Sequence, residues 1–262
     1  MISFVGAGPG AADLITLRGA ERLAAADVVI WAASLVPEAL LDHCRPGVTL
    51  HDSKTMTLDE VCAVYAAHPD AAIVRLHSGD PTIYSAIGEQ IAWCRANDRS
   101  FEVVPGVSSM NATAAHAGCE LTIPGVAQSV VLTRLAAGTR ASMPDRETIQ
   151  AYAATGATMV VFLSVAHVET LRERLLAEGT AYRPDTPVVV GHRISWPDER
   201  LLRTTLDAMA GDVRTAGFDA TTTFLIGPAL AGATEQRSHV YAADYTTRFR
   251  VASPVVAGAP HG

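Results

Sequence analysis

Residues 2–10 read Ile-Ser-Phe-Val-Gly-Ala-Gly-Pro-Gly, a β-type run that ends in a glycine-rich turn. α/β proteins commonly bind adenosine-type cofactors in such a turn, at the carboxyl end of a parallel strand. The dinucleotide fingerprint G-x-G-x-x-G places its third glycine where this chain has Ala11. Pro9 also interrupts the turn and has no N–H to donate to a pyrophosphate. The stretch therefore predicts a cofactor loop in an α/β protein, but not a typical NAD loop.

The composition narrows the class of protein. The chain has 262 residues, enough for one large or two ordinary domains, and 49% of them are hydrophobic. A net charge of -7 and the lack of a basic run argue against nucleic acid as a partner. No apolar segment approaches the ~18 residues of a membrane span, and the chain begins directly on a strand-like run. We therefore expect a cytoplasmic protein with no membrane partner.

The cysteines and histidines give no sign of a metal site. The four cysteines are widely spaced, with no C-x-x-C pair, so we expect free thiols. The nine histidines show no H-E-x-x-H or similar spacing. The sequence therefore predicts no metal ligands.

The first half alternates strand-like and helix-like segments, as expected for a parallel sheet. We predict strands at 2–5, 28–31, 72–77 and 101–104, and helices at 17–25, 58–67, 83–96 and 110–117. The strands are continuous apolar runs, which is typical of strands buried on both faces.

The breaker Pro124-Gly125 separates a second set of segments. We predict strands at 129–133, 159–163, 188–191, 201–206 and 222–226, a polar loop at 138–145 and a helix at 168–178, with a hairpin through 196–199. The predicted fold is therefore two α/β domains, residues 1–124 and 125–231, followed by a tail at 232–262. We expect the last ten or so residues to be disordered.

Polar residues follow several of the predicted strands. Asp80, in the loop 77–81, either caps the next helix or holds part of a cofactor. Ser108 and Ser109 follow Pro105-Gly106 and either cap the next helix or face a cleft. They do not form the G-x-S-x-G elbow of a nucleophilic serine.

Basic charge is almost entirely arginine, because Lys54 is the only lysine. The planar guanidinium of arginine binds carboxylates in a bidentate manner. Arg134 and Arg193, at predicted strand ends, are therefore either contacts for a substrate carboxylate or members of surface salt bridges.

Taken in order, the loops read G-A-G-P-G-x-x-D-L-I-T, S-G-D-P-x-x-Y, V-P-G-V-S-S, L-T-I-P and L-T-R, with P-V-V-V and W-P-D-E further on. This ordered set resembles the tetrapyrrole (corrin/porphyrin) methyltransferases, which use S-adenosylmethionine, over about residues 1–230. Three stretches, at 31–36, 120–125 and 196–205, are similar to the branch that methylates precorrin-4 at C11 in cobalamin biosynthesis.

The resemblance implies a homodimer of two α/β domains, with the cofactor in the cleft between the domains. The cofactor contacts that it implies are Pro9, Ser78, Gly79, Asp80, Ile83, Ser108, Ser109, Leu163, Ile194 and Thr222. Candidate substrate contacts are Gly8, Arg134 and Arg193, with Arg75 as a further arginine. Lys54 is a candidate catalytic residue, because relatives that act on uroporphyrinogen carry a lysine near this position. Those relatives also carry an acid where this chain has Ala32, which argues against the uroporphyrinogen reaction.

The expected activity is methyl transfer from S-adenosylmethionine to C11 of precorrin-4, giving precorrin-5. Alternatives within the fold are cobalt-precorrin-4, another position of the corrin ring, or a protein acceptor of the kind that diphthine synthase uses. A nucleotide-dependent oxidoreductase is disfavoured by Pro9, Ala11 and the missing ribose-binding acid after residue 31. A cofactor-binding regulator without catalysis is a further alternative.

Overall fold

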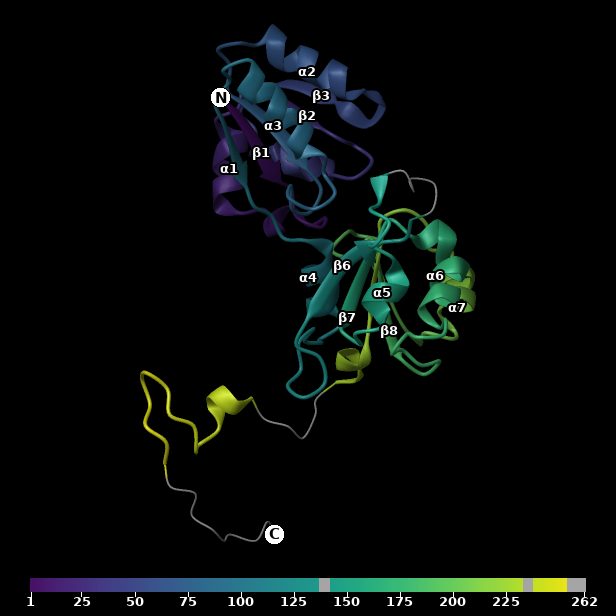
Figure 1. Cartoon of the computed structure of the whole chain (residues 1–262). Helices are drawn as coiled ribbons and strands as arrows, with labels where there is room; N and C mark the ends of the chain where they lie inside the picture. Colours follow the sequence, from purple (N-terminus) through teal and green to yellow (C-terminus); the bar gives the residue numbers. More distant parts are fainter. Residues whose placement is uncertain (137–141, 233–237, 254–262) are drawn as a thin grey trace.

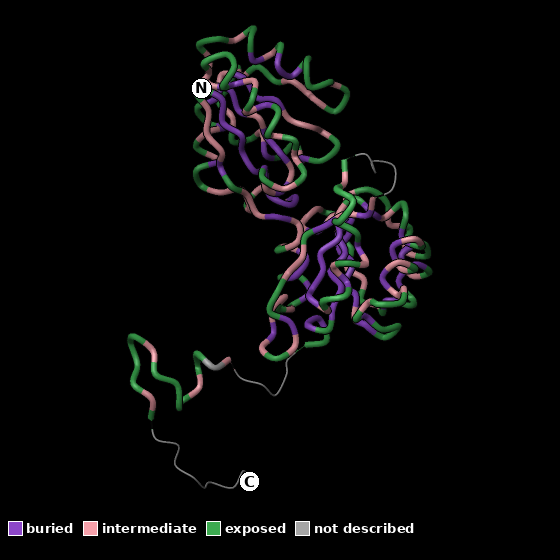
Figure 2. Tube along the Cα trace, in the orientation of Figure 1, coloured by how far each residue is buried: buried purple, intermediate pink, exposed green. Residues whose placement is uncertain are grey.

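The computed structural model describes residues 1–136, 142–232 and 238–253. Two β-sheets of five strands each form the body of the protein. Figure 1 shows the two sheets in separate lobes, each with its helices. The predicted two α/β domains are thus confirmed. Residues 238–253 lie apart from the body in Figures 1 and 2 and are mostly exposed. The predicted disorder at the end of the tail falls on 254–262, outside the described residues.

The first sheet is entirely parallel, as predicted. Its strands are β1 (Ile2–Gly6), β2 (Val28–Trp31), β3 (Thr49–Asp52), β4 (Ile73–His77) and β5 (Phe101–Val104), in the order β3-β2-β4-β1-β5. The chain moves from β1 to β2 on one side and later to β5 on the other. Open α/β sheets bind ligands where the strand order reverses in this way, at the carboxyl ends of the strands.

Helices cover both faces of the first sheet. On one face, Leu23 of α1 (Leu17–Ala24) packs with Val5 and Val29. On the other face, Tyr65 of α2 (Leu58–Ala67) and Cys94 of α3 (Ile87–Ala96) pack with Phe4. Burial on both faces explains why these strands read as unbroken apolar runs.

The second sheet is mixed. Its strands are β6 (Val130–Arg134), β7 (Thr158–Phe162), β8 (Pro187–His192), β9 (Arg200–Thr205) and β10 (Thr222–Ile226), in the order β6-β7-β10-β8-β9. Only β6 and β7 are parallel within this sheet. The predicted hairpin through 196–199 is confirmed, because β8 and β9 pair antiparallel on either side of it.

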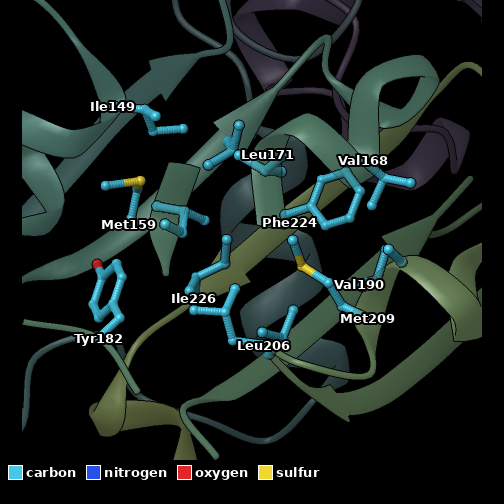
Figure 3. Packing of buried hydrophobic residues seen from close by; sticks show 14 of the residues in the cluster. Ile149, Met159, Val168, Leu171, Tyr182, Val190, Leu206, Met209, Phe224 and Ile226 are labelled. Atoms are coloured by element: carbon cyan, nitrogen blue, oxygen red, sulfur yellow. The ribbon is translucent and has the colours of Figure 1, made fainter. Parts of the chain in front are cut away.

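The larger core of the second sheet lies beneath α5 (Ile149–Ala153), α6 (Val168–Leu175) and α7 (Met209–Ala216). Figure 3 shows Phe224 and Ile226 of β10 packed among Leu171, Met209 and their neighbours. The opposite face is covered by α4 (Ser109–His116), whose Ala114 packs with Val160 and Leu225.

The packing of α4 differs from the prediction, which placed the helix at 110–117 in the first domain. In the structure α4 contacts β8 and β10 of the second sheet. The first sheet ends at Val104, so this packing favours a boundary between Val104 and Ser109 over one near residue 125. The breaker Pro124-Gly125 lies in a tight turn after α4, where Ile123 and Ala127 pair.

Four other elements differ from the sequence prediction. β3 was missed because Thr-Leu-His-Asp is short, polar and at the edge of its sheet. The short α5 and the alanine- and glycine-containing α7 were also missed. The helix predicted at 83–96 begins only at Ile87, because Tyr84 and Ala86 adopt positive φ, which breaks the helical backbone. The loop predicted at 138–145 is described only from residue 142 onward.

Candidate functional site

Three glycines bring the loops after β1, β4 and β5 into contact. A Cβ atom on Gly106 would lie 2.2 Å from the carbonyl oxygen of Gly79, and one on Gly6 would lie 2.5 Å from the Cα of Gly106. No side chain fits at either distance, so both positions require glycine. Gly79 has a φ of +65°, a conformation that glycine adopts without strain. The three strand ends therefore form one compact wall.

Asp80 ties two of these loops together. Its Oδ2 accepts a hydrogen bond from the Gly106 amide at 2.9 Å, and its Oδ1 accepts one from the Thr82 amide at 2.8 Å. Burial alone would raise the pKa of Asp80, but the hydrogen bonds from Thr82 and Gly106 outweigh it and lower the pKa. Asp80 does not cap α3, whose N-cap residue is Ala86, so the capping interpretation is wrong.

The loop after β1 contacts the turn between β8 and β9. The Trp196 Nε1 donates a hydrogen bond to the carbonyl of Pro9 at 2.9 Å, and the Ala11 amide donates to Ser195 Oγ, also at 2.9 Å. A Cβ atom on Gly10 would lie 2.4 Å from the indole ring of Trp196. The glycine-rich turn thus holds the two domains together.

A cavity of about 650 Å³ lies between the two sheets. Ten lining residues are those that the sequence resemblance assigned to the cofactor: Pro9, Ser78, Gly79, Asp80, Ile83, Ser108, Ser109, Leu163, Ile194 and Thr222. They come from the loops after β1, β4 and β5 in the first sheet, and from β10 and the loops after β7 and β8 in the second. The structure therefore brings this whole predicted set to one cavity.

The two serines occupy different places in this wall. Ser108 is the N-cap of α4, so the capping interpretation is correct for it, and its side chain is buried. Ser109 Oγ lies 2.9 Å from Thr223 Oγ1, where either hydroxyl can donate. Ser109 therefore joins the start of α4 to strand β10.

Backbone strain gathers around the cavity. Four non-glycine residues with positive φ line it, namely Tyr84, Ala86, Leu163 and Thr221. Two more, Arg193 and Ser195, flank the lining residue Ile194. Such conformations cost free energy and cluster at functional sites, where the surrounding structure holds them in place.

Four candidate residues lie outside the cavity lining. Gly8 pairs with Gly79 through two backbone hydrogen bonds, and Lys54 forms an ion pair with Asp52 at 3.1 Å. Arg134 donates to Ser142 Oγ, and Arg193 pairs with Asp198 and stacks over Trp196. Direct contact of these residues with a substrate stays a prediction.

Several residues that line the cavity are not among those predicted from the sequence. Thr113 of α4 is fully buried, its Oγ1 has no hydrogen-bond partner among the described residues, and it lines the cavity. Phe162, at the end of β7, lines it as well and packs edge-on against Tyr84, with ring centroids 5.8 Å apart. Thr113 lies inside a helix and Phe162 at the end of a strand, and only the packing of the two domains places them at the cavity.

The described residues contain neither a cluster suited to a metal ion nor a helix suited to crossing a membrane. Across 1–136, 142–232 and 238–253, no cluster of three or more His, Cys, Asp or Glu side chains is arranged to hold a metal ion. The helices in the same ranges include none with the length and apolar character needed to cross a membrane.

The chain is similar to known proteins over most of its length. Residues 1–210 match the model of the family Tetrapyrrole (Corrin/Porphyrin) Methylases. A precorrin-4 C(11)-methyltransferase of Sinorhizobium sp is 40% identical over 251 residues, which cover 95% of this chain and 98% of that protein.

Two solved structures share the fold. The crystal structure of a cobalt precorrin-4 methyltransferase, a cobalamin biosynthetic enzyme, superposes with a TM-score of 0.83 at 37% identity, covering 87% of this chain and 95% of the other. A uroporphyrin-III C-methyltransferase of Thermus thermophilus, complexed with S-adenyl homocysteine, has a TM-score of 0.69 at 27% identity, covering 87% and 92%. The chain therefore belongs to the tetrapyrrole (corrin/porphyrin) methylase family.

Proposed function

We propose that the chain transfers a methyl group from S-adenosylmethionine to C11 of precorrin-4, forming precorrin-5 in cobalamin biosynthesis. The observation that carries this proposal is the interdomain cavity, which gathers all ten residues that the family resemblance assigns to the cofactor. The 40% identity to a precorrin-4 C(11)-methyltransferase over 95% of the chain supports the choice of substrate.

The chemistry of the cavity fits S-adenosylmethionine. Gly79 lines the cavity, and a Cβ atom built there would have no atom nearer than 3.8 Å, so a ligand can approach the backbone closely at this position. The hydroxyls of Ser108, Ser109 and Thr113 line the same space, and Thr113 Oγ1 lacks a partner among the described residues. A polar ligand with several donors and acceptors satisfies such a wall.

The side chains that line the cavity bind and orient the ligands, and none is required as a nucleophile. S-adenosylmethionine, when bound, supplies a methyl group that its sulfonium has already activated. The wall formed by the loops after β1, β4 and β5 fixes the position of the ligands, and Leu163 and Ile194 cover it from the second domain. Alignment of reacting groups and exclusion of water are the contributions expected of such a site.

Cobalt-precorrin-4 is the second candidate substrate. The solved structure with a TM-score of 0.83 is that of a cobalt precorrin-4 methyltransferase, at 37% identity. The identity to the precorrin-4 enzyme is 40%, so we favour the cobalt-free substrate. Parallel assays with precorrin-4 and with cobalt-precorrin-4 distinguish the two candidates.

The test is methyl transfer from ¹³C-labelled S-adenosylmethionine to precorrin-4, with NMR of the product. The proposal expects one labelled methyl group at C11. Label at another ring carbon would reject the C11 assignment while leaving the family's chemistry intact, and faster turnover of cobalt-precorrin-4 would favour the second candidate.

The family resemblance also supports a homodimer in the cytoplasm as part of this proposal. Analytical ultracentrifugation of the purified chain should give twice the mass of one 27.5 kDa chain. A monomer at micromolar concentration would contradict the proposed assembly.

A further inference from the structure

Arg75 places a positive charge on the inner wall of the cavity. It lies on β4, between Phe4 of β1 and Ile30 of β2. Its Nη1 donates to the Ile30 carbonyl at 3.3 Å and to Ser53 Oγ at 2.9 Å, and its Nε is shielded and has no partner among the described residues. Arg75 is the only arginine or lysine among the described residues that line the cavity.

This charge is not neutralised by the part of the chain that the structure describes. No carboxylate of residues 1–136, 142–232 or 238–253 forms an ion pair with Arg75. Burial lowers the pKa of the guanidinium. A buried charge without a counter-ion is costly, which favours a site where a bound anion completes the pair.

His77 lies two residues further along the same face of β4 and also lines the cavity. Its ring is buried, and its Nε2 has no partner among the described residues. Burial, together with the positive charge of Arg75, lowers the pKa of His77 to about 3. His77 is therefore neutral near pH 7 and can donate one hydrogen bond without adding charge.

We propose that Arg75 binds a peripheral carboxylate of the tetrapyrrole, with His77 as a hydrogen-bonding neighbour. This inference rests on the proposed function, because precorrin-4 carries acetate and propionate groups. The guanidinium points toward the end of β2, where Ser53 Oγ also donates to the Trp31 carbonyl. Ala32 and Leu35, which follow β2, line this part of the cavity and are not among the expected cofactor contacts.

The carboxylate of S-adenosylmethionine is the other anionic group that the Arg75 guanidinium can bind in this cavity. The expected cofactor contacts of the first domain lie beyond the ends of β1, β4 and β5, whereas Arg75 lies within β4. This position favours the tetrapyrrole. Separate titrations with each ligand distinguish the two sources.

The test compares Arg75→Gln with Arg99→Gln. Arg99 is a matched control, because it also donates to backbone carbonyls and has a shielded Nε, but it does not line the cavity. Each variant is titrated with S-adenosylhomocysteine alone, and then with precorrin-4 in the presence of S-adenosylhomocysteine.

For Arg75→Gln, we expect the Kd of precorrin-4 to rise at least about tenfold, because a charge-assisted bidentate contact is lost. The Kd of S-adenosylhomocysteine should stay within about twofold, and KM should rise more than kcat falls. Arg75→Lys keeps the charge but not the planar fork, so it should give an intermediate Kd. Arg99→Gln should leave both Kd values unchanged.

An unchanged Kd for precorrin-4 in folded Arg75→Gln would overturn the inference while leaving the proposed function standing. A parallel rise in the Kd of S-adenosylhomocysteine would assign Arg75 to the cofactor and also overturn it. Failure of the wild-type chain to methylate precorrin-4 would reject the proposed function instead. If Arg75→Gln does not fold, the test is NMR of the His77 ring in the wild-type chain during titration with precorrin-4. A carboxylate bound beside Arg75 should shift the resonances of the His77 ring. An absent shift would contradict the inference.

Discussion

The indole nitrogen of Trp196 donates a hydrogen bond to the carbonyl of Pro9 at a distance of 2.9 Å. The two residues are far apart in the sequence and belong to different domains. Pro9 lies in the glycine-rich turn after β1, and Trp196 lies in the turn between β8 and β9. Since Pro9 lines the cavity, this contact connects the position of the second domain to the wall of the site.

Replacing Trp196 by Phe tests this connection. The variant keeps an aromatic ring beside Gly10 but leaves the Pro9 carbonyl without its donor, at a cost of roughly 1 kcal/mol, or about fivefold in affinity. Calorimetric titration with S-adenosylhomocysteine should show this weaker binding. Trp93→Phe is the control, because Trp93 packs on Tyr65 away from the cavity. Equal affinity of Trp196→Phe and wild type would show that the interdomain contact does not support the site.

Gly106→Ala should disrupt the wall of the cavity. The added Cβ atom would meet the Gly79 carbonyl oxygen at 2.2 Å, and hydrogen bonds to Asp80 and Gly8 hold the backbones of Gly106 and Gly79 in place. Overpacking of this kind costs about 1–3 kcal/mol, so we expect a lower Tm and weaker binding of S-adenosylhomocysteine. Gly88→Ala, at an exposed helical position with no atom within 4 Å of the new Cβ, should change stability by less than about 1 kcal/mol. Similar thermal melts for the two variants would contradict the expected clash.

Asp80→Asn should show its effect only while the carboxylate of the wild type is ionised. The pKa of Asp80 is lowered in the folded chain, so ionisation stabilises the fold above the ordinary pKa of aspartate, about 4, and this contribution is lost as the pH falls through the lowered value. Thermal melts of both proteins should differ most near about pH 7 and should converge only as the pH falls through the lowered pKa of Asp80. A difference that grows as the solution becomes more acidic would show that the Gly106 and Thr82 hydrogen bonds do not favour the ionised form.

Phe224→Ala tests the core of the second domain. Phe224 is fully buried on β10 and packs in one cluster with Val168 and Leu171 of α6 and Met209 of α7, all labelled in Figure 3. Truncation of a buried phenylalanine costs about 3–5 kcal/mol. Denaturant titration should therefore give a much lower free energy of unfolding. A loss below about 1 kcal/mol would mean that this core repacks around the cavity left by the ring.

The sequence predicted the parallel first sheet well, because buried parallel strands have a simple signature of short apolar runs between turn residues. The edge strand β3 has no such signature, since Thr49 and Leu50 are exposed. The sequence also could not show that α4 crosses to the second sheet, because Ser-Met-Asn-Ala-Thr-Ala-Ala-His has no pronounced apolar face that would indicate which sheet the helix covers. The breaker Pro124-Gly125 predicts a domain boundary near residue 125, whereas the packing of α4 favours one nearer Ser109.

The loops that line the cavity were easier to predict than the lining residues that belong to helices and strands. Glycine, proline and small polar residues at strand ends carry a local signal, so Gly79, Asp80 and Ser108 could be selected from the sequence. Thr113 and Phe162 belong to regular elements and reach the cavity only through the tertiary packing of two domains. Arg75 was one of several arginines in the sequence, and only the fold separates it from Arg134 and Arg193, which lie outside the lining.

The most direct test of a cofactor site shared by both domains is a crystal structure of the chain with S-adenosylhomocysteine. The ligand should lie in the cavity, in contact with Gly79, Asp80 and Ser108 on one side and with Leu163, Ile194 and Thr222 on the other. A ligand that contacts only one domain, or that binds outside the cavity lined by Pro9 and Thr222, would contradict the account.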